Sequence, residues 1–138
     1  MNCYKESLPI NCPPLSSLEN DDSLILYRVV NTNILSESDF LPYSRLYPDN
    51  PRYKTCCDAH GVSFYSNPEV AKNKCLEIYK KGKKLGVFIA KVKFKLNNLG
   101  KYKCTEQTAH CNFWFYSITN IESDLEYLEL VNISYDNR

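Results

Sequence analysis

Residues 60–96 read HGVSFYSNPEVAKNKCLEIYKKGKKLGVFIAKVKFKL, and this stretch predicts a strand, a helix and a second strand in direct succession. Residues 61–66 alternate small or polar with apolar side chains and are rich in aromatic and β-branched types, which is typical of a half-buried strand. Residues 87–96 begin as an apolar run and end in strict alternation. We expect this second strand to enter the core and to emerge at an edge of the sheet.

The helix between these strands begins with three agreeing signals in the tripeptide Asn67-Pro68-Glu69. The asparagine side chain can cap the free N–H groups, the proline has the φ of a first helical position, and the glutamate suits the positive end of the helix dipole. We expect the helix to span residues 67–84, with Gly82 or Gly86 ending it. Apolar residues at helical spacing predict its buried stripe, which consists of Ala71, Cys75, Ile78 and Tyr79.

The rest of the chain completes one domain of the α+β class, rich in strands and with one main helix. At 138 residues the chain is long enough to bury a real core. Residues 1–23 form a lead-in segment that either drapes over the domain or stays mobile, and residues 24–138 form the domain itself. Strands are predicted for residues 23–30, 111–118 and 125–133, the last at an edge. Residues 31–59, and the stretch from Gly100 to Thr108, are predicted as loops.

Composition narrows the cellular setting. No apolar run approaches the roughly 20 residues that cross a bilayer, and the N-terminus shows neither a basic nor an apolar signal region. The seven cysteines are odd in number and irregularly spaced. We therefore expect a cytoplasmic protein, not bound to a membrane, whose cysteines are mostly reduced thiols.

Charge is unevenly distributed along the chain. Residues 72–103 contain eleven lysines and one acidic residue, Glu77, although the net charge of the whole chain is only +1. This lysine-rich face can attract phosphates, nucleic acid or an acidic protein. The simpler interpretation is a solvated helix and an edge strand that Lys91, Lys93 and Lys95 protect from aggregation. Residues 72–103 contain no arginine, the better ligand for phosphate, and this favours the simpler interpretation.

Cysteine and histidine residues precede two of the predicted strands, and they raise the question of a zinc site. These residues are Cys56, Cys57 and His60 before one strand, and Cys104, His110 and Cys111 before the other. Zinc needs four ligands, usually in paired motifs such as CxxC, and the chain has no such pair. We expect ordinary thiols and a surface histidine here, and no metal.

The order of motifs resembles the ADP-ribosyltransferase superfamily, in its Arg-Ser-Glu branch. Leu26-Tyr27-Arg28 is similar to the first motif, and residues 61–75 are similar to the second motif and its helix. Residues 86–94 resemble the following strand, and residues 111–116 and 127–130 resemble the last two strands. The likeness covers residues 24–133, although each motif is short. The Glu of the third motif is missing, because Asn112 stands near its expected place.

The resemblance implies a compact ADP-ribosyltransferase fold and NAD as a substrate. Arg28 would hold a phosphate or ribose, with Tyr27 and Gly61 beside it, and Ser63 would support the nicotinamide ribose. Tyr65 or Trp114 would stack on the nicotinamide. The catalytic set implied is Arg28, Ser63, His110, Asn112 and Glu106, with His110 or Glu106 steering the acceptor. An asparagine can hydrogen-bond a ribose hydroxyl but cannot act as a base.

Two function classes remain open at this point. The first is an NAD-dependent transferase, a toxin or phage effector acting on a host, with an antitoxin protein as a further partner. The second is a non-enzymatic protein that binds a nucleotide or a host protein through the lysine-rich face of residues 72–103. Because the chain has no recognisable nucleic-acid-binding module, we expect no nucleic-acid partner.

Overall fold

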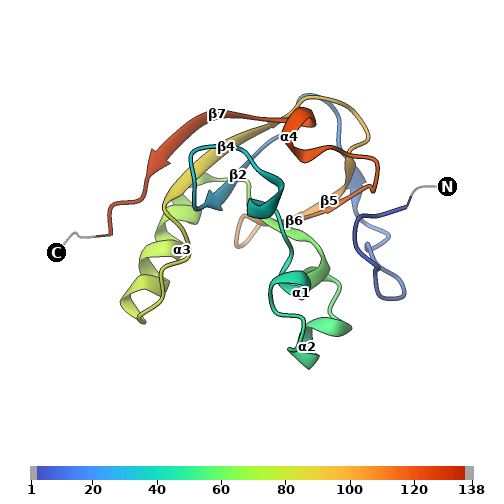
Figure 1. Cartoon of the computed structure of the whole chain (residues 1–138), viewed down its shortest axis with the longest axis horizontal. Coiled ribbons are helices and arrows are strands. Elements are labelled where there is room, and N and C mark those ends of the chain that lie inside the picture. Colours follow the sequence, from blue (N-terminus) through green and yellow to red (C-terminus); the bar gives the residue numbers. More distant parts are fainter. Residues whose placement is uncertain (1–2, 136–138) are drawn as a thin grey trace.

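A computed structural model describes residues 3–135, which form an α+β domain built on one seven-stranded antiparallel sheet (Figure 1). The strand order is β1-β5-β6-β3-β2-β4-β7, and every neighbouring pair is antiparallel. The strands are β1 (Leu18–Glu19), β2 (Ile25–Val30), β3 (Val62–Tyr65), β4 (Phe88–Phe94), β5 (Gly100–Thr105), β6 (His110–Phe115) and β7 (Leu125–Asn132).

The main helix is α3 (Pro68–Lys80), which lies against β2 and β4 (Figure 1). Short helical turns occupy the long connection between β2 and β3 and the approach to β7. They are the 3-10 helices Glu37–Asp39 and Asp58–His60 and the α-helices α1 (Tyr43–Leu46), α2 (Pro51–Lys54) and α4 (Ile121–Asp124). The long connection is therefore irregular, as the sequence predicts.

Successive side chains of the central strands point to opposite faces of the sheet, and apolar residues cover part of each face. One face carries Leu26, Val30 and Phe64 into the larger cluster of buried side chains. The other face carries Tyr27 and Val29 against the inner side of α3. The pair Tyr27↔Tyr65 is the only register pair between β2 and β3, so these two strands diverge in the middle of the sheet. This divergence positions the site described below.

The start of α3 is confirmed, and its end comes earlier than expected. The Asn67 side chain accepts hydrogen bonds from the N–H groups of Glu69 and Val70, at 2.8 and 3.3 Å. The helix ends at Lys80 rather than residue 84 because Gly82 adopts φ +97°, a left-handed conformation that glycine tolerates. In the buried stripe, Ala71 and Cys75 are fully buried, but Tyr79 is 42% exposed and packs on Tyr135.

Two expectations about strands are wrong. The strand β4 is not at an edge, because β7 pairs along its whole length and is itself the outermost strand. Lys91 and Lys93 therefore lie opposite Glu129 and Glu126 on β7 instead of facing an open edge. The stretch after Gly100 is a strand, β5, and not a loop, since it pairs with β6 over six residues.

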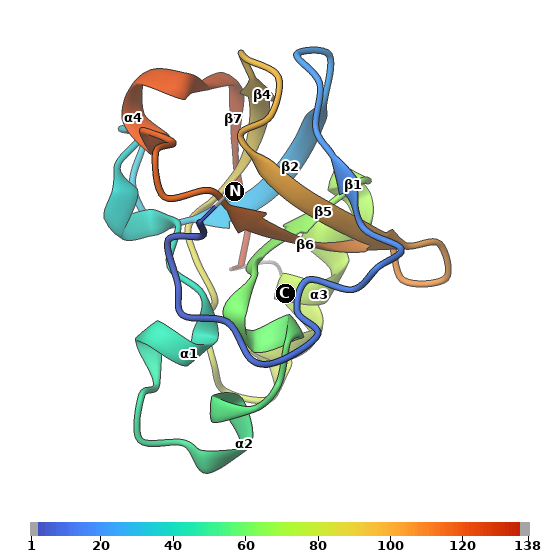
Figure 2. The same ribbon diagram turned by 90° about the vertical axis from the view of Figure 1, so that its right-hand side faces the viewer.

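The N-terminal segment is attached to the domain at several points. The strand β1 pairs with β5 (Figure 2), and Tyr4 forms an isolated bridge with Tyr116. Within this segment Asn20 is 2% exposed, and its side chain bonds Leu96 O and the N–H groups of Leu99 and Gly100. These contacts hold the turn between β4 and β5 in place.

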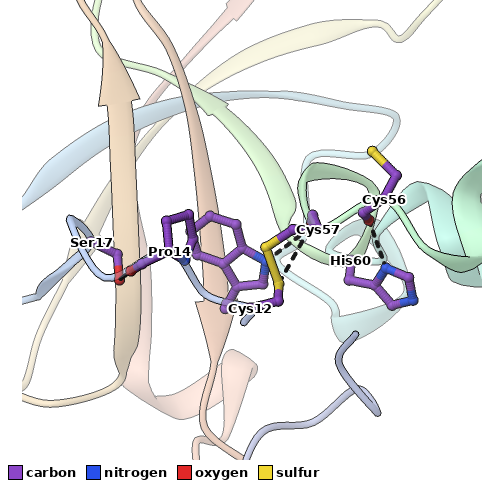
Figure 3. The surroundings of a disulfide bond; sticks show 7 residues. Cys12, Pro14, Ser17, Cys56, Cys57 and His60 are labelled. Atoms are coloured by element: carbon purple, nitrogen blue, oxygen red, sulfur yellow. Dashed lines mark hydrogen bonds between the residues drawn. A yellow bond between two sulfur atoms is a disulfide. The ribbon is translucent and has the colours of Figure 1, made fainter. Parts of the chain in front are cut away.

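The expectation of mostly reduced thiols is wrong, because four of the seven cysteines form disulfides. Cys104 and Cys111 are register partners on β5 and β6, with 4.0 Å between their Cα atoms. Cys12 bonds Cys57, 45 positions away, and so ties the N-terminal segment to the turn before β3 (Figure 3). Cys3, Cys56 and Cys75 remain free. The pairings depend on contacts that only the tertiary fold creates.

Candidate functional site

Polar side chains on two adjacent strands face one cavity of about 540 Å³. Ser63 and Tyr65 on β3, and Gly61 directly before the strand, lie at alternate positions and so share a face. On β6, Asn112 lies directly opposite Ser63, and His110 lies opposite Tyr65. All five residues line the cavity together with Arg28. The sheet thus brings together most of the residues that the sequence singles out.

Ser63 and His110 form a short contact between side chains in this cavity. The Ser63 Oγ and His110 Nε2 atoms are 2.6 Å apart, and both side chains are half-buried. The Tyr65 ring meets the imidazole edge-on at 5.3 Å between ring centroids. Burial lowers the pKa of His110 below its ordinary value of 6.5, and Arg28 and Lys74 lower it further, while Asp58 opposes them. The imidazole is therefore neutral at pH 7 and can accept a proton.

Asn112 has an amide group with no protein partner. The residue is 8% exposed, lines the cavity, and makes no side-chain hydrogen bond to any residue between 3 and 135. The amide atoms are nevertheless accessible from the cavity, since the Tyr127 hydroxyl is the only fully buried polar side-chain atom of the described residues that lacks a partner. Because this amide lies beside Ser63, it can bond a molecule that enters the cavity.

Arg28 occupies the gap where β2 and β3 diverge. Its Nε donates to Asp39 O at 2.9 Å, and its Nη1 donates to Ser63 O. The guanidinium carbon lies 5.4 and 5.8 Å from the ring centroids of Phe40 and Phe64. Burial lowers the pKa of Arg28 to about 10, so the group is still charged at pH 7.

No carboxylate of residues 3–135 lies within ion-pairing distance of Arg28. Its two hydrogen bonds leave three N–H donors of the guanidinium unused by the described residues. A half-buried cation that forms no direct ion pair, although the charge of Asp39 acts on it from nearby, favours the binding of an anionic group such as phosphate or carboxylate at the cavity wall.

Three tyrosines of the β2–β3 connection form the outer wall of the cavity. Tyr43, Tyr47 and Tyr53 pack on one another with ring centroids 5.9–6.2 Å apart. The N-terminal segment braces this wall, because Glu6 bonds Arg45 of α1 at 3.3 Å. The tyrosines of this loop thus line the cavity.

A second cavity of about 800 Å³ adjoins the first. The two share five lining residues, which are Tyr43, Ser63, Tyr65, Leu85 and His110. The far wall of the second cavity is formed by α3, through Val70, Ile78 and the ion pair between Lys74 and Glu77. The Ser63–His110 pair therefore lies where the two cavities meet.

Three residues that the sequence assigns to the site lie elsewhere. Tyr27 packs with the buried cluster beneath α3, and Glu106 is exposed in the turn between β5 and β6. Trp114 is 2% exposed, and its Nε1 donates to Cys57 O at 3.1 Å. A Cβ at Gly61 would lie 3.0 Å from the Trp114 indole, so this glycine makes room for the tryptophan.

Sequence reasoning misses the contribution of Asp58, Lys83 and Lys84 to the first cavity. Asp58 carries a weak signal, because it lies three positions before Gly61 in the turn that opens β3. The two lysines follow α3, and the sequence indicates only that they are charges near a helix end. Their position at the cavity depends on the path of the loop to β4.

The lysines of residues 72–103 are divided among α3, the loop after it, β4 and β5. Some of them already have partners in the chain. Lys93 Nζ donates to Asp22 O at 3.0 Å, and Lys103 Nζ donates to Ser16 Oγ at 2.7 Å.

In the described residues, no three side chains of the metal-binding types gather, and no helix has the length and apolar character needed to cross a bilayer.

Comparison with known proteins gives no relative: no protein-family model, no curated protein and no solved structure matches this chain.

Proposed function

We propose that the chain is an NAD-dependent enzyme of the ADP-ribosyltransferase type, with Arg28 and Ser63 in the nucleotide pocket. One observation carries the proposal. Arg28, Ser63, His110 and Asn112, which come from three strands, line a single cavity. These are four of the five catalytic residues implied by the resemblance to that superfamily. A toxin or phage effector that acts on a host molecule is the biological role consistent with it.

Each side chain has a definite task in the proposed reaction. Arg28 holds a phosphate of NAD through the donors that the protein leaves unused. Ser63 supports the nicotinamide ribose, and Asn112 bonds a ribose hydroxyl with its free amide. Tyr65, half-buried at the cavity wall, stacks on the nicotinamide.

The reaction breaks the bond between the ribose C1′ and nicotinamide and forms a bond from C1′ to the acceptor. Positive charge develops on the ribose ring in the transition state, and no carboxylate replaces the missing Glu beside Asn112. His110 takes the acceptor proton, because it is neutral at pH 7 and lies at the junction with the second cavity. The acceptor enters through that second cavity.

A nicotinamide-release assay tests this proposal. We expect wild-type protein to release nicotinamide from NAD, and Arg28→Ala and Ser63→Ala each to lower the rate at least about 100-fold. Arg52→Ala, on exposed α2, is the matched control and should leave the rate unchanged. If the Arg28→Ala variant does not fold, Arg28→Lys takes its place in the assay, because lysine keeps the positive charge. No nicotinamide release, with no NAD binding by calorimetry, would exclude the transferase.

A non-enzymatic protein that binds a nucleotide or a host protein is the second candidate. The anion site at Arg28 supports nucleotide binding without turnover. Contact through the lysines of residues 72–103 has less support, because those on β4 lie opposite glutamates. NAD binding by calorimetry without nicotinamide release would favour this candidate.

A further inference from the structure

The Ser63–His110 pair has the geometry of a nucleophile and its base, a feature that NAD chemistry does not use. We propose that Ser63 is a catalytic nucleophile activated by His110, and that the cleft hydrolyses esters whose acyl part carries an anionic group. This activity needs no NAD and goes beyond the proposed function.

The Ser63 hydroxyl is placed where a substrate can reach it. The side chain is half-buried and lines both cavities, so a molecule that spans their junction passes over its Oγ. A serine is a weak nucleophile unless an adjacent base removes its proton. His110 Nε2, at 2.6 Å from Oγ, is within hydrogen-bonding reach and supplies that base.

The surroundings of His110 suit a base that starts neutral. Burial, Arg28 and Lys74 all disfavour the imidazolium, so the ring is neutral at pH 7 and ready to accept the serine proton. Asp58, which lines the same cavity, favours the imidazolium that then forms. The Tyr65 ring packs edge-on against the imidazole and fixes its orientation.

Two groups in the cavity can stabilise negative charge. Asn112 lies on the strand position opposite Ser63 and is 8% exposed as a residue, and its amide is accessible from the cavity and has no partner among residues 3–135. It is placed to donate to the oxyanion that forms when Ser63 attacks a carbonyl. Arg28 has unused donors and forms no direct ion pair among the described residues, so it is placed to hold a carboxylate or phosphate of the acyl part.

The reaction runs in two balanced steps. Ser63 Oγ bonds to the carbonyl carbon while its proton passes to His110 Nε2. The ester C–O bond then breaks, and the alcohol leaves with that proton. In the second step water attacks the acyl-serine, His110 takes the proton from water, and the carboxylic acid leaves as Ser63 Oγ regains the proton.

Labelling with a fluorophosphonate probe, in the absence of NAD, tests the nucleophile. The probe forms an Oγ–P bond and loses fluoride, and peptide mass spectrometry identifies the modified residue. We expect wild-type protein to be labelled at Ser63, Ser63→Ala to lose the label, and His110→Gln to react at least about 100-fold more slowly. Ser66→Ala removes an exposed serine of the same segment and should be labelled as wild type. No label at Ser63 of folded wild-type protein would overturn the proposal.

Two chromogenic esters test the substrate class. We expect the mono-p-nitrophenyl ester of succinate to be hydrolysed at least about tenfold faster than p-nitrophenyl acetate, with Arg28→Lys narrowing the difference. Equal rates on the two esters would overturn the role of Arg28, and rates unaffected by Ser63→Ala would overturn the activity. Ester hydrolysis without nicotinamide release refutes the transferase alone, and the reverse result refutes this inference alone.

Discussion

Two asparagines of low exposure differ in their roles, because one side chain is bonded within the protein and the other is free to bond a ligand. The Asn20 side chain is fully used, because it bonds backbone groups of Leu96, Leu99 and Gly100 in the turn between β4 and β5. Asn112 is 8% exposed as a residue, and its amide bonds nothing in the described chain but is accessible from the cavity. An amide that is free at a cavity wall can bond a ligand.

The stability of the protein should depend on pH through His110. Its pKa in the folded protein lies below the ordinary value of 6.5, because burial, Arg28 and Lys74 outweigh Asp58. Below pH 6.5 the unfolded chain therefore binds a proton that the folded chain does not. The free energy of unfolding should fall as pH drops from 6.5 to the folded pKa, by about 1.4 kcal/mol per pH unit in that window.

Urea unfolding between pH 4.5 and 7.5 checks this expectation. His110→Gln lacks the titrating group, so its unfolding free energy should fall less than that of the wild type over the same range. Asp58→Asn should extend the loss to lower pH and so enlarge it, because Asp58 is the group that favours the imidazolium. Identical pH profiles for wild type and His110→Gln would show that the pKa of His110 is not depressed.

At the scale of elements, the helix α3 shows what local sequence can predict. Its first turn is set by three adjacent residues, and the Asn67 cap forms as expected. Asn67→Ala should lower the free energy of unfolding by about 1 kcal/mol, since two N–H groups lose their acceptor. Asn67→Asp should keep most of the stability. Chemical denaturation measures both, and equal losses in the two variants would show that the cap contributes nothing.

The errors about strands have a common physical cause. Whether β4 lies at an edge depends on β7, which joins it more than thirty positions later in the chain, and no local pattern carries that pairing. Gly100 and the polar run from Thr105 to Thr108 predict a loop, yet six register pairs with β6 stabilise the strand β5 in this stretch. The resemblance only implies that Arg28 and Ser63 share a pocket, whereas the contact of Ser63 with His110 requires the register of β3 on β6.

At the scale of the whole molecule, the N-terminal segment is part of the site's support. It braces α1 through Glu6 and Arg45, and the disulfide from Cys12 reaches the turn that precedes β3 (Figure 3). Disulfides are typical of proteins from oxidising compartments, so the predicted cytoplasmic location has no support from the cysteines. The sequence could not predict this, because seven cysteines allow many pairings.

The two disulfides should contribute unequally to stability. In the chain-entropy account, a cross-link stabilises by restricting the unfolded chain, and the effect grows with the length of the loop. The Cys12–Cys57 separation of 45 gives about 4 kcal/mol, and the Cys104–Cys111 separation of 7 gives about 2 kcal/mol. The paired variant Cys12→Ser/Cys57→Ser should therefore unfold at a lower temperature than Cys104→Ser/Cys111→Ser.

Thermal unfolding with and without dithiothreitol measures the difference. Wild-type protein should lose stability on reduction, and each paired variant should lose less than the wild type because it has one bond fewer to break. Loss of the Cys12–Cys57 bond should also loosen the turn at Asp58 and Ala59, which line the first cavity, and so weaken ligand binding there. If reduction leaves wild-type unfolding unchanged, the disulfides do not form in solution, and contacts such as Glu6–Arg45 alone hold the segment in place.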